Sequence, residues 1–131
     1  MSHDLTPIMP FMRVVGISIT SATREQVVGT LPWREDLCTT LGVVHGGALM
    51  TFADSLGATC AFLNLPTGAL TSTIESKTNF FRPFTKGTLH GTTIPLHVGR
   101  TTIVVQTDIR DDAGKRVALV TQTQAVITRT A

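Results

Sequence analysis

Residues 42–54 read Gly-Val-Val-His-Gly-Gly-Ala-Leu-Met-Thr-Phe-Ala-Asp. His45, Gly46 and Gly47 stand where a loop is expected to turn into a helix, and Asp54 falls in the apolar part of that helix. The N-terminus of a helix has unpaired N–H groups and partial positive charge, so it suits an oxyanion. A carboxylate in an apolar helix is costly unless it is paired or used. The stretch therefore suggests acyl-group chemistry, with a donor site at one end and a carboxylate further along.

The spacing of His45 and Asp54 limits how they can share a substrate. The two residues are nine positions apart. In one straight helix that is ~900° of rotation and ~13.5 Å of rise, so the side chains point to opposite sides. Within one chain they cannot touch the same substrate atom. If both act on one acyl group, two helices must lie side by side and antiparallel, with the Gly46 end of one chain facing Asp54 of the other. If the two residues are catalytic, their spacing thus predicts a dimer.

Length and composition predict one domain covering residues 1–131. Hydrophobic residues make up 42% of the chain, which is enough for a core, whereas charged residues make up only 15%. So few charges predict that part of the surface is buried between subunits. The net charge of +2 gives no reason to expect nucleic acid as a partner and is compatible with a small polyanionic ligand.

The sequence gives no sign of targeting, a membrane span or a metal site. Residues 1–6 are polar, and no apolar run approaches the ~20 residues of a membrane span, so we expect neither a signal peptide nor a membrane partner. Cys38 and Cys60 form no CxxC motif and have no His cluster near them, which argues against a disulfide scaffold and a zinc site. We expect a reduced, cytoplasmic location and no cofactor or metal.

The order of elements predicts the fold class. Residues 7–15 are expected to form a short helix or turn, residues 14–21 and 24–33 a hairpin, residues 33–42 a polar loop, and Ala48–Leu63 a buried helix. Residues 70–82, 87–98, 101–110 and 116–128 are β-rich and separated by short turns, so we interpret them as an antiparallel meander. One helix among so much strand sequence must be wrapped by the sheet, which predicts an α+β fold.

Three motifs carry a family resemblance. They are Gly42-x-x-His45-Gly46-Gly47 followed by Asp54, then Asn79-Phe80-Phe81-Arg82-Pro83, then His97-Val98-Gly99-Arg100. With them the chain resembles, over roughly residues 11–127, the hotdog-fold acyl-CoA thioesterases of the phenylacetate-pathway and 1,4-dihydroxy-2-naphthoyl-CoA type. The resemblance implies an antiparallel sheet wrapped around one long central helix, dimerisation through that helix and an edge strand, and a tetramer of two dimers.

The resemblance also implies roles for individual residues. Asp54 would be the nucleophile or the general base that activates water, and the Gly46 N–H would polarise the thioester carbonyl. His45 would shape or assist that pocket, Gly47 shares the helix start, and Thr73 would stand near the reacting centre. Two segments would line the acyl and pantetheine channel, with Arg100 as a candidate for the CoA phosphates; their residues are Phe80, Phe81, Arg82, Pro83, His97, Val98, Gly99 and Arg100. No metal would be required.

Thr39 departs from the family pattern. The family usually has Asn or Gln six residues before the His of the motif, and Thr has a hydroxyl but not the reach or the paired donor and acceptor of an amide. Thr40 is an alternative if the loop is shifted. Structural alternatives stay open for the other residues as well: Asp54 could be a buried carboxylate capped by the neighbouring subunit, His45 could only order the loop, and Gly46 and Gly47 could serve close packing.

Three functions remain in view. The leading hypothesis is an acyl-CoA thioesterase that releases a carboxylic acid and free CoA from an aryl or medium-chain acyl-CoA. The second is a non-catalytic acyl-CoA-binding module on the same fold, which Thr39 keeps open. The third is a hotdog hydratase or dehydratase, which fits less well because Gly46 and Gly47 directly follow His45 and Asp54 lies nine residues on.

Overall fold

The computed structural model of the chain describes residues 8–128. Its elements, in chain order, are α1 (Pro10–Val15), β1 (Ser18–Ala22), β2 (Val27–Pro32), the short 3₁₀ turns η1 (Glu35–Leu37) and η2 (Thr40–Gly42), α2 (Gly46–Leu63), β3 (Leu70–Phe80), β4 (Thr88–Val98), β5 (Thr102–Arg110) and β6 (Arg116–Ile127). Pro7, the first residue of the predicted N-terminal helix or turn, lies outside the described residues.

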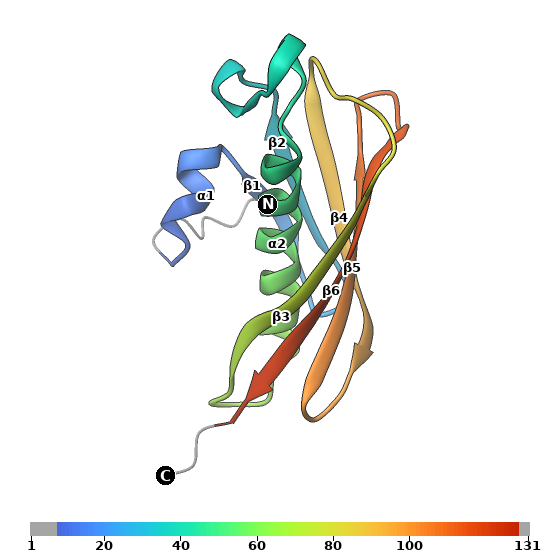
Figure 1. The fold of residues 1–131 in the computed structure, drawn as a ribbon. Helices are drawn as coiled ribbons and strands as arrows, with labels where there is room; N and C mark the ends of the chain where they lie inside the picture. Colours follow the sequence, from blue (N-terminus) through green and yellow to red (C-terminus); the bar gives the residue numbers. More distant parts are fainter. Residues whose placement is uncertain (1–7, 129–131) are drawn as a thin grey trace.

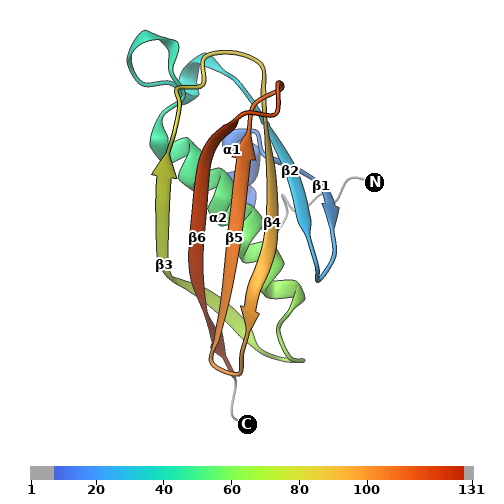
Figure 2. The same cartoon turned by 90° about the vertical axis from the view of Figure 1, so that its right-hand side faces the viewer.

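The six strands form one antiparallel sheet in the order β1-β2-β4-β5-β6-β3. Figure 1 shows this sheet curled around α2, and Figure 2 shows α2 behind the sheet, so the helix covers one face. The face of α2 toward the sheet is apolar, and Phe52, Leu56 and Cys60 are fully buried there. The predicted α+β fold, with an antiparallel sheet around one long helix, is confirmed.

The expected four-strand meander is wrong at β3. β4, β5 and β6 are consecutive neighbours, but β3 pairs with β6 at the opposite edge because β4 already lies between β2 and β5. Residues 81–87 therefore cross the end of the sheet instead of closing a hairpin (Figure 2). Three strand spacings need ~14 Å, and seven residues can reach ~23 Å. The consequence is that β3 is an edge strand.

Two further boundaries differ from the predictions. Val14 and Val15 belong to α1 and not to the first strand, because Gly16 ends that helix with a left-handed φ of 94°. The central helix begins at Gly46, two residues before the predicted start. His45 is thus the N-cap and Gly46 and Gly47 are the first two helical residues, in keeping with the predicted change from loop to helix at this motif.

By length and composition, α2 resembles a membrane-spanning helix. It has 18 residues, a mean hydropathy of 1.2, and no charged residue except Asp54. The core helix of a soluble protein passes the same test, so this is weak evidence for a membrane span. The helix packs against β2, β3, β4, β5 and β6. Its apolar composition is therefore explained by its place in the core of the fold.

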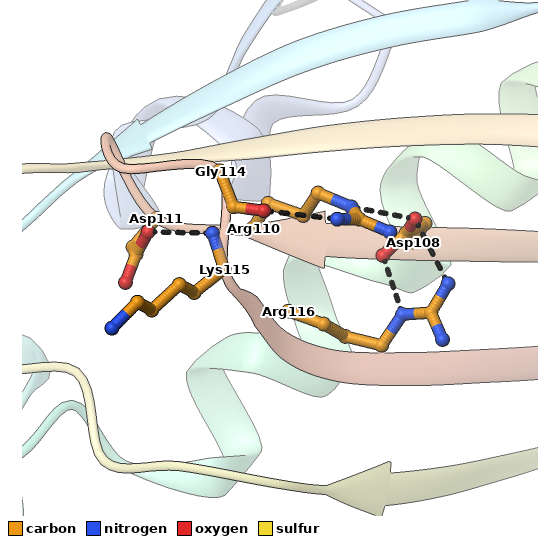
Figure 3. A network of polar contacts seen from close by, with 6 residues as sticks. All are labelled: Asp108, Arg110, Asp111, Gly114, Lys115 and Arg116. Atoms are coloured by element: carbon orange, nitrogen blue, oxygen red, sulfur yellow. Dashed lines mark hydrogen bonds and ion pairs between the residues drawn. The ribbon is translucent and has the colours of Figure 1, made fainter.

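An ion-pair cluster closes the β5–β6 turn on the sheet face away from α2 (Figure 3). Asp108 accepts hydrogen bonds from Arg110 Nε at 2.9 Å and from Arg116 Nε at 3.0 Å. Arg110 also donates from Nη1 to the Gly114 carbonyl, and the Lys115 N–H donates to Asp111. Partial burial alone would raise the pKa of Asp108, but the hydrogen bonds and charges of Arg116 and Arg110 outweigh burial and lower it.

The lowered pKa of Asp108 predicts a pH-dependent contribution to stability. A carboxyl whose pKa is depressed in the folded state stabilises the fold above its ordinary value of 3.8, and this stabilisation is lost as the pH falls through the folded value. We expect Asp108→Asn to lower the urea midpoint at pH 7, and we expect that difference to shrink as the pH falls below 3.8 and through the lowered folded value. Urea titrations of both proteins across this range measure the effect. A difference independent of pH would contradict it.

Candidate functional site

His45 and the two glycines after it build the N-terminus of α2. His45 is the N-cap residue, and its Nδ1 accepts a hydrogen bond from the Gly47 N–H at 2.8 Å. The Ala48 and Leu49 N–H groups donate to the His45 carbonyl. Gly46 is the first helical residue, so its N–H has no acceptor within the helix. The ring of His45 thus orders the first turn of α2. The Gly46 N–H has no acceptor in this turn and is available as a donor to a ligand.

A cavity of about 410 Å³ opens beside this helix start. The Phe80 ring closes on Gly46 so tightly that a Cβ at Gly46 would lie 3.1 Å from the Phe80 Cζ. Several of the predicted site residues meet here, because the cavity is lined by Thr39, Val43, Val44, Gly46, Leu49, Phe80, Phe81, Arg82, Pro83 and Phe84. The structure therefore brings the 80–83 segment and Thr39 to the N-terminus of α2.

Asp54 lies two turns further along α2, exposed on the side that faces β3. Its Oδ1 accepts hydrogen bonds from Thr73 Oγ1 at 3.0 Å and from Gln122 Nε2 at 2.7 Å. Thr73, which the family resemblance singled out, is therefore in contact with Asp54. Neither bond involves Oδ2. Both of these hydrogen bonds are thus made by one oxygen, Oδ1, of a residue that is exposed.

Two glutamines of β6, Gln122 and Gln124, were not predicted as site residues. Gln122 and Gln124 point toward α2 at positions where a strand of this sheet otherwise carries Val and Ala, and both are buried. Gln124 Nε2 donates to Thr73 Oγ1 at 2.9 Å, so a chain of hydrogen bonds reaches Asp54 from two sides. The sequence signal that could have found them is the period of two along β6. This period puts the side chains of Gln122 and Gln124 on the same face of the sheet as Val120.

The third motif lies elsewhere. His97 and Val98 end β4, and Gly99 and Arg100 form its turn to β5, where the Gly99 N–H donates to the Thr102 carbonyl. This turn is at the end of the sheet opposite the 81–87 crossover (Figures 1 and 2). The side chains of His97, Val98 and Arg100 are exposed there. One chain therefore does not bring this motif to the Gly46 cavity.

Metal and cysteine chemistry find little support in the described residues. Residues 8–128 contain no group of three or more His, Cys, Asp or Glu side chains that could hold a metal ion. Cys38 and Cys60 are free thiols. Burial raises the pKa of the Cys60 thiol to about 11, which keeps it protonated and unreactive at neutral pH.

Known proteins are similar to this chain in sequence. The model of the thioesterase superfamily matches residues 41–118, more than half of the chain. A protein of Vibrio cholerae provisionally named an esterase is 31% identical over 112 residues, which cover 86% of this chain and 75% of that protein. The proofreading thioesterase EntH of Cronobacter turicensis is 26% identical over 113 residues, which cover 86% of this chain and 82% of EntH.

Solved structures share the fold. The crystal structure of a thioesterase from Haemophilus influenzae matches with a TM-score of 0.86 at 26% identity, covering 90% of this chain and 82% of that chain. This likeness confirms the hotdog fold that the motifs implied. Family model, relatives and fold agree: the chain belongs to the thioesterase superfamily and is a thioester hydrolase of the hotdog fold.

Proposed function

We propose that the protein hydrolyses an acyl-CoA thioester to a carboxylic acid and free CoA, with Asp54 as the reacting carboxylate and the Gly46 N–H as the donor to the thioester carbonyl. One observation carries this proposal. The Asp54 Oδ1 is held by two donors while Oδ2 is not engaged by either, on the same helix whose first N–H lacks an intrahelical acceptor.

The chemistry follows from these two groups. The Gly46 N–H binds the carbonyl oxygen and stabilises the negative charge that grows on it during attack. Asp54 acts by one of two routes. In the direct route its carboxylate attacks the carbonyl carbon, the C–S bond breaks as an acyl anhydride forms on Asp54, the departing thiolate takes a proton from water, and a water molecule then hydrolyses the anhydride to the free acid. In the other route Asp54 takes a proton from a water that attacks the carbonyl carbon. In the water route the new C–O bond forms, the C–S bond breaks, and the proton held by Asp54 passes to the departing sulfur. His45 acts by fixing the turn that presents Gly46 and Gly47.

The site is completed by a second copy of the chain. Gly46 and Asp54 are separated by ~12 Å along a straight helix, too far to act on one carbonyl. An antiparallel partner would place its own Asp54 opposite Gly46. β3 presents an unpaired edge, and apolar side chains on that side of the molecule are exposed, among them Met50, Ile74 and Phe80. We infer a dimer through α2 and β3, and a tetramer of two dimers.

The same antiparallel arrangement would bring the third motif, residues 97–100, to the site of the partner chain. Turning a second copy end for end moves its β4–β5 turn to the end of the molecule where the 80–83 segment lies. His97, Val98, Gly99 and Arg100 of one chain would then line the substrate channel of the other. Arg100, exposed at this turn, would meet the phosphates of CoA. We infer that both segments contribute to the site, one from each subunit.

The dimer predicts a result for one exposed residue of the β3 edge. Ile74 is 62% exposed in a bulge of that strand. Natural edge strands use lysine to prevent pairing, so Ile74→Lys is expected to convert the protein to monomers and to lower activity with it. Leu41→Lys is the control, because Leu41 is 94% exposed and belongs to the 3₁₀ turn η2, not to β3. Sedimentation equilibrium measures both masses, and unchanged mass for Ile74→Lys would contradict the dimer.

The acyl group belongs in the cavity beside Gly46. Its lining by Phe80, Phe81, Phe84 and Leu49 suits an aromatic ring or a medium-length alkyl chain. Thr39 is among the residues that line this cavity, at the position where an amide is usual in the family, and we infer a narrower set of substrates from this difference. We infer that residues 1–131 act as a single thioesterase domain, in the cytoplasm, without metal or cofactor.

A free-thiol assay tests the proposed function. The purified protein is offered a panel of acyl-CoAs that includes benzoyl, phenylacetyl, hexanoyl, octanoyl and palmitoyl thioesters, and CoA release is followed with a thiol reagent. Turnover of an aryl or medium-chain member supports the proposal. If no member releases thiol while the protein binds acyl-CoA in a calorimeter, the non-catalytic binding module replaces it. An enoyl-CoA in the panel, monitored for added water, tests the hydratase reading.

A further inference from the structure

Two buried amides in β6 stand out against their surroundings. Gln122 is 1% exposed and Gln124 is 0% exposed, on the sheet face that packs against α2. Burying a primary amide is unfavourable unless its hydrogen bonds are satisfied, and the neighbouring position on this face is Val120. Two buried glutamines here therefore lower the stability of the fold unless their amides are hydrogen-bonded. Their hydrogen-bond partners indicate why they are present.

The direction of each hydrogen bond follows from the chemistry of the partners. A carboxylate can only accept, so the group that meets Asp54 Oδ1 must be the NH₂ of Gln122. The Thr73 hydroxyl has a single proton and gives it to the same Oδ1, so it must accept from the NH₂ of Gln124. Both routes converge on one oxygen of Asp54, and neither reaches the other.

The amide of Gln122 is locked in this orientation. Its Oε1 is buried and has no hydrogen-bond partner in the described part of the chain. It lies against Gly57, one turn after Asp54, where any Cβ would come within 1.9 Å of it. A flip of the amide would set its oxygen against the Asp54 carboxylate. Gly57 thus leaves the space that the amide of Gln122 occupies. In this orientation the Oε1 of Gln122 has no partner in the described residues, and its NH₂ group faces Asp54.

We propose that Gln122 is a positioning residue of the thioesterase: it holds Oδ1 of Asp54 so that Oδ2 is the oxygen that meets the substrate. Gln124 acts one step further away, by orienting the Thr73 hydroxyl that makes the second bond to Oδ1. This assignment rests on the proposed function, in which Asp54 is the reacting carboxylate. It adds that β6 fixes which of the two carboxylate oxygens reacts.

The first test removes the donor and keeps the length of the side chain. Gln122→Met leaves Asp54 with one bond, so we expect kcat to fall by about 10²-fold with KM little changed, as a misplaced reacting group does. Gln106→Met is the matched control, because Gln106 lies in the same sheet between the buried Val105 and Thr107 and so points to the opposite face. The control is expected to keep wild-type kcat. Thermal melts show that both variants are folded.

The second test measures how the kcat of a Gln122 variant depends on pH. If Gln122 had only a structural role, the substitution would not change this pH dependence. In Gln122→Glu the new carboxyl can donate to Oδ1 only while it is protonated. The kcat of this variant is therefore expected to fall as the pH rises through that ionisation, a limb absent from the wild type and from Gln122→Met. A variant that shows the wild-type pH profile would overturn the assignment.

The outcomes separate this inference from the proposed function. If the wild type turns over an acyl-CoA, Asp54→Asn does not, and folded Gln122→Met keeps wild-type kcat, the positioning role is wrong and the thioesterase proposal stands. If the wild type releases no thiol from any acyl-CoA, both are overturned. A loss of kcat in Gln122→Met together with the new pH limb in Gln122→Glu supports the role.

Discussion

Asp54→Asn is expected to lower kcat by about 10²- to 10⁴-fold, the range over which removal of a general base acts. The substitution preserves shape and keeps the Oδ1 acceptor for Thr73 and Gln122. It replaces Oδ2 by an NH₂ group, which can neither take a proton from water nor attack a carbonyl. The loss therefore falls on the chemical step, while KM changes little.

Thiol release from the best acyl-CoA, measured for wild type and Asp54→Asn at equal protein concentration, gives this ratio. Asp108→Asn is the control, since its carboxylate lies in the arginine cluster on the outer face of the sheet, and it should leave kcat unchanged (Figure 3). Equal turnover by Asp54→Asn would remove this carboxylate from the mechanism. A loss in Asp108→Asn of similar size would show that the assay reports stability rather than chemistry.

Gly46→Pro is expected to lower kcat by about 10²- to 10³-fold, the effect of losing one oxyanion donor. Proline lacks the N–H but is favoured at the first position of a helix. It also requires an extended conformation in the residue before it, and His45 already has φ −61° and ψ 137°. The substitution therefore removes the proposed donor and leaves the helix start compatible with the fold.

Gly46→Ala separates the donor from the space around it. Both variants place a Cβ about 3.1 Å from the Phe80 Cζ, but alanine keeps the N–H. We expect Gly46→Ala to retain most of kcat and to show its effect, through Phe80, on KM. Circular dichroism and thermal melts check that both proteins fold. Similar kcat values for the proline and alanine variants would contradict the role of the Gly46 N–H.

The local part of the site is visible in the sequence. The His-Gly-Gly motif predicts a helix start because the cap, the two small residues and the apolar run that follows are contiguous. The position of Asp54 on that helix follows from the same run. Thr73 could be singled out only through the family resemblance, since β3 contains several threonines, and the structure then places its hydroxyl on Asp54.

Contacts between segments that are far apart in the chain could not be predicted from the sequence. Short turns and alternation favoured a hairpin between β3 and β4, whereas the pairing of β3 with β6 is set by which strands already have two neighbours. The alternation in β6 places Gln122 and Gln124 on the same face as Val120, but it does not show that their amides meet Asp54 and Thr73, because these partners come from α2 and β3. The separation of His97 from Phe80 by the length of the sheet likewise depends on the direction of β4.

Complementation between two inactive variants tests the shared site most directly. Asp54→Asn and Gly46→Pro chains are co-expressed with different tags, and the mixed dimer is purified and assayed for thiol release. If one chain supplies Gly46 and the other Asp54, one of the two sites in each mixed dimer is intact, so about half of wild-type kcat per dimer is expected. If both groups act within one chain, every site carries a lesion, and a mixed dimer as inactive as its parents would contradict the account.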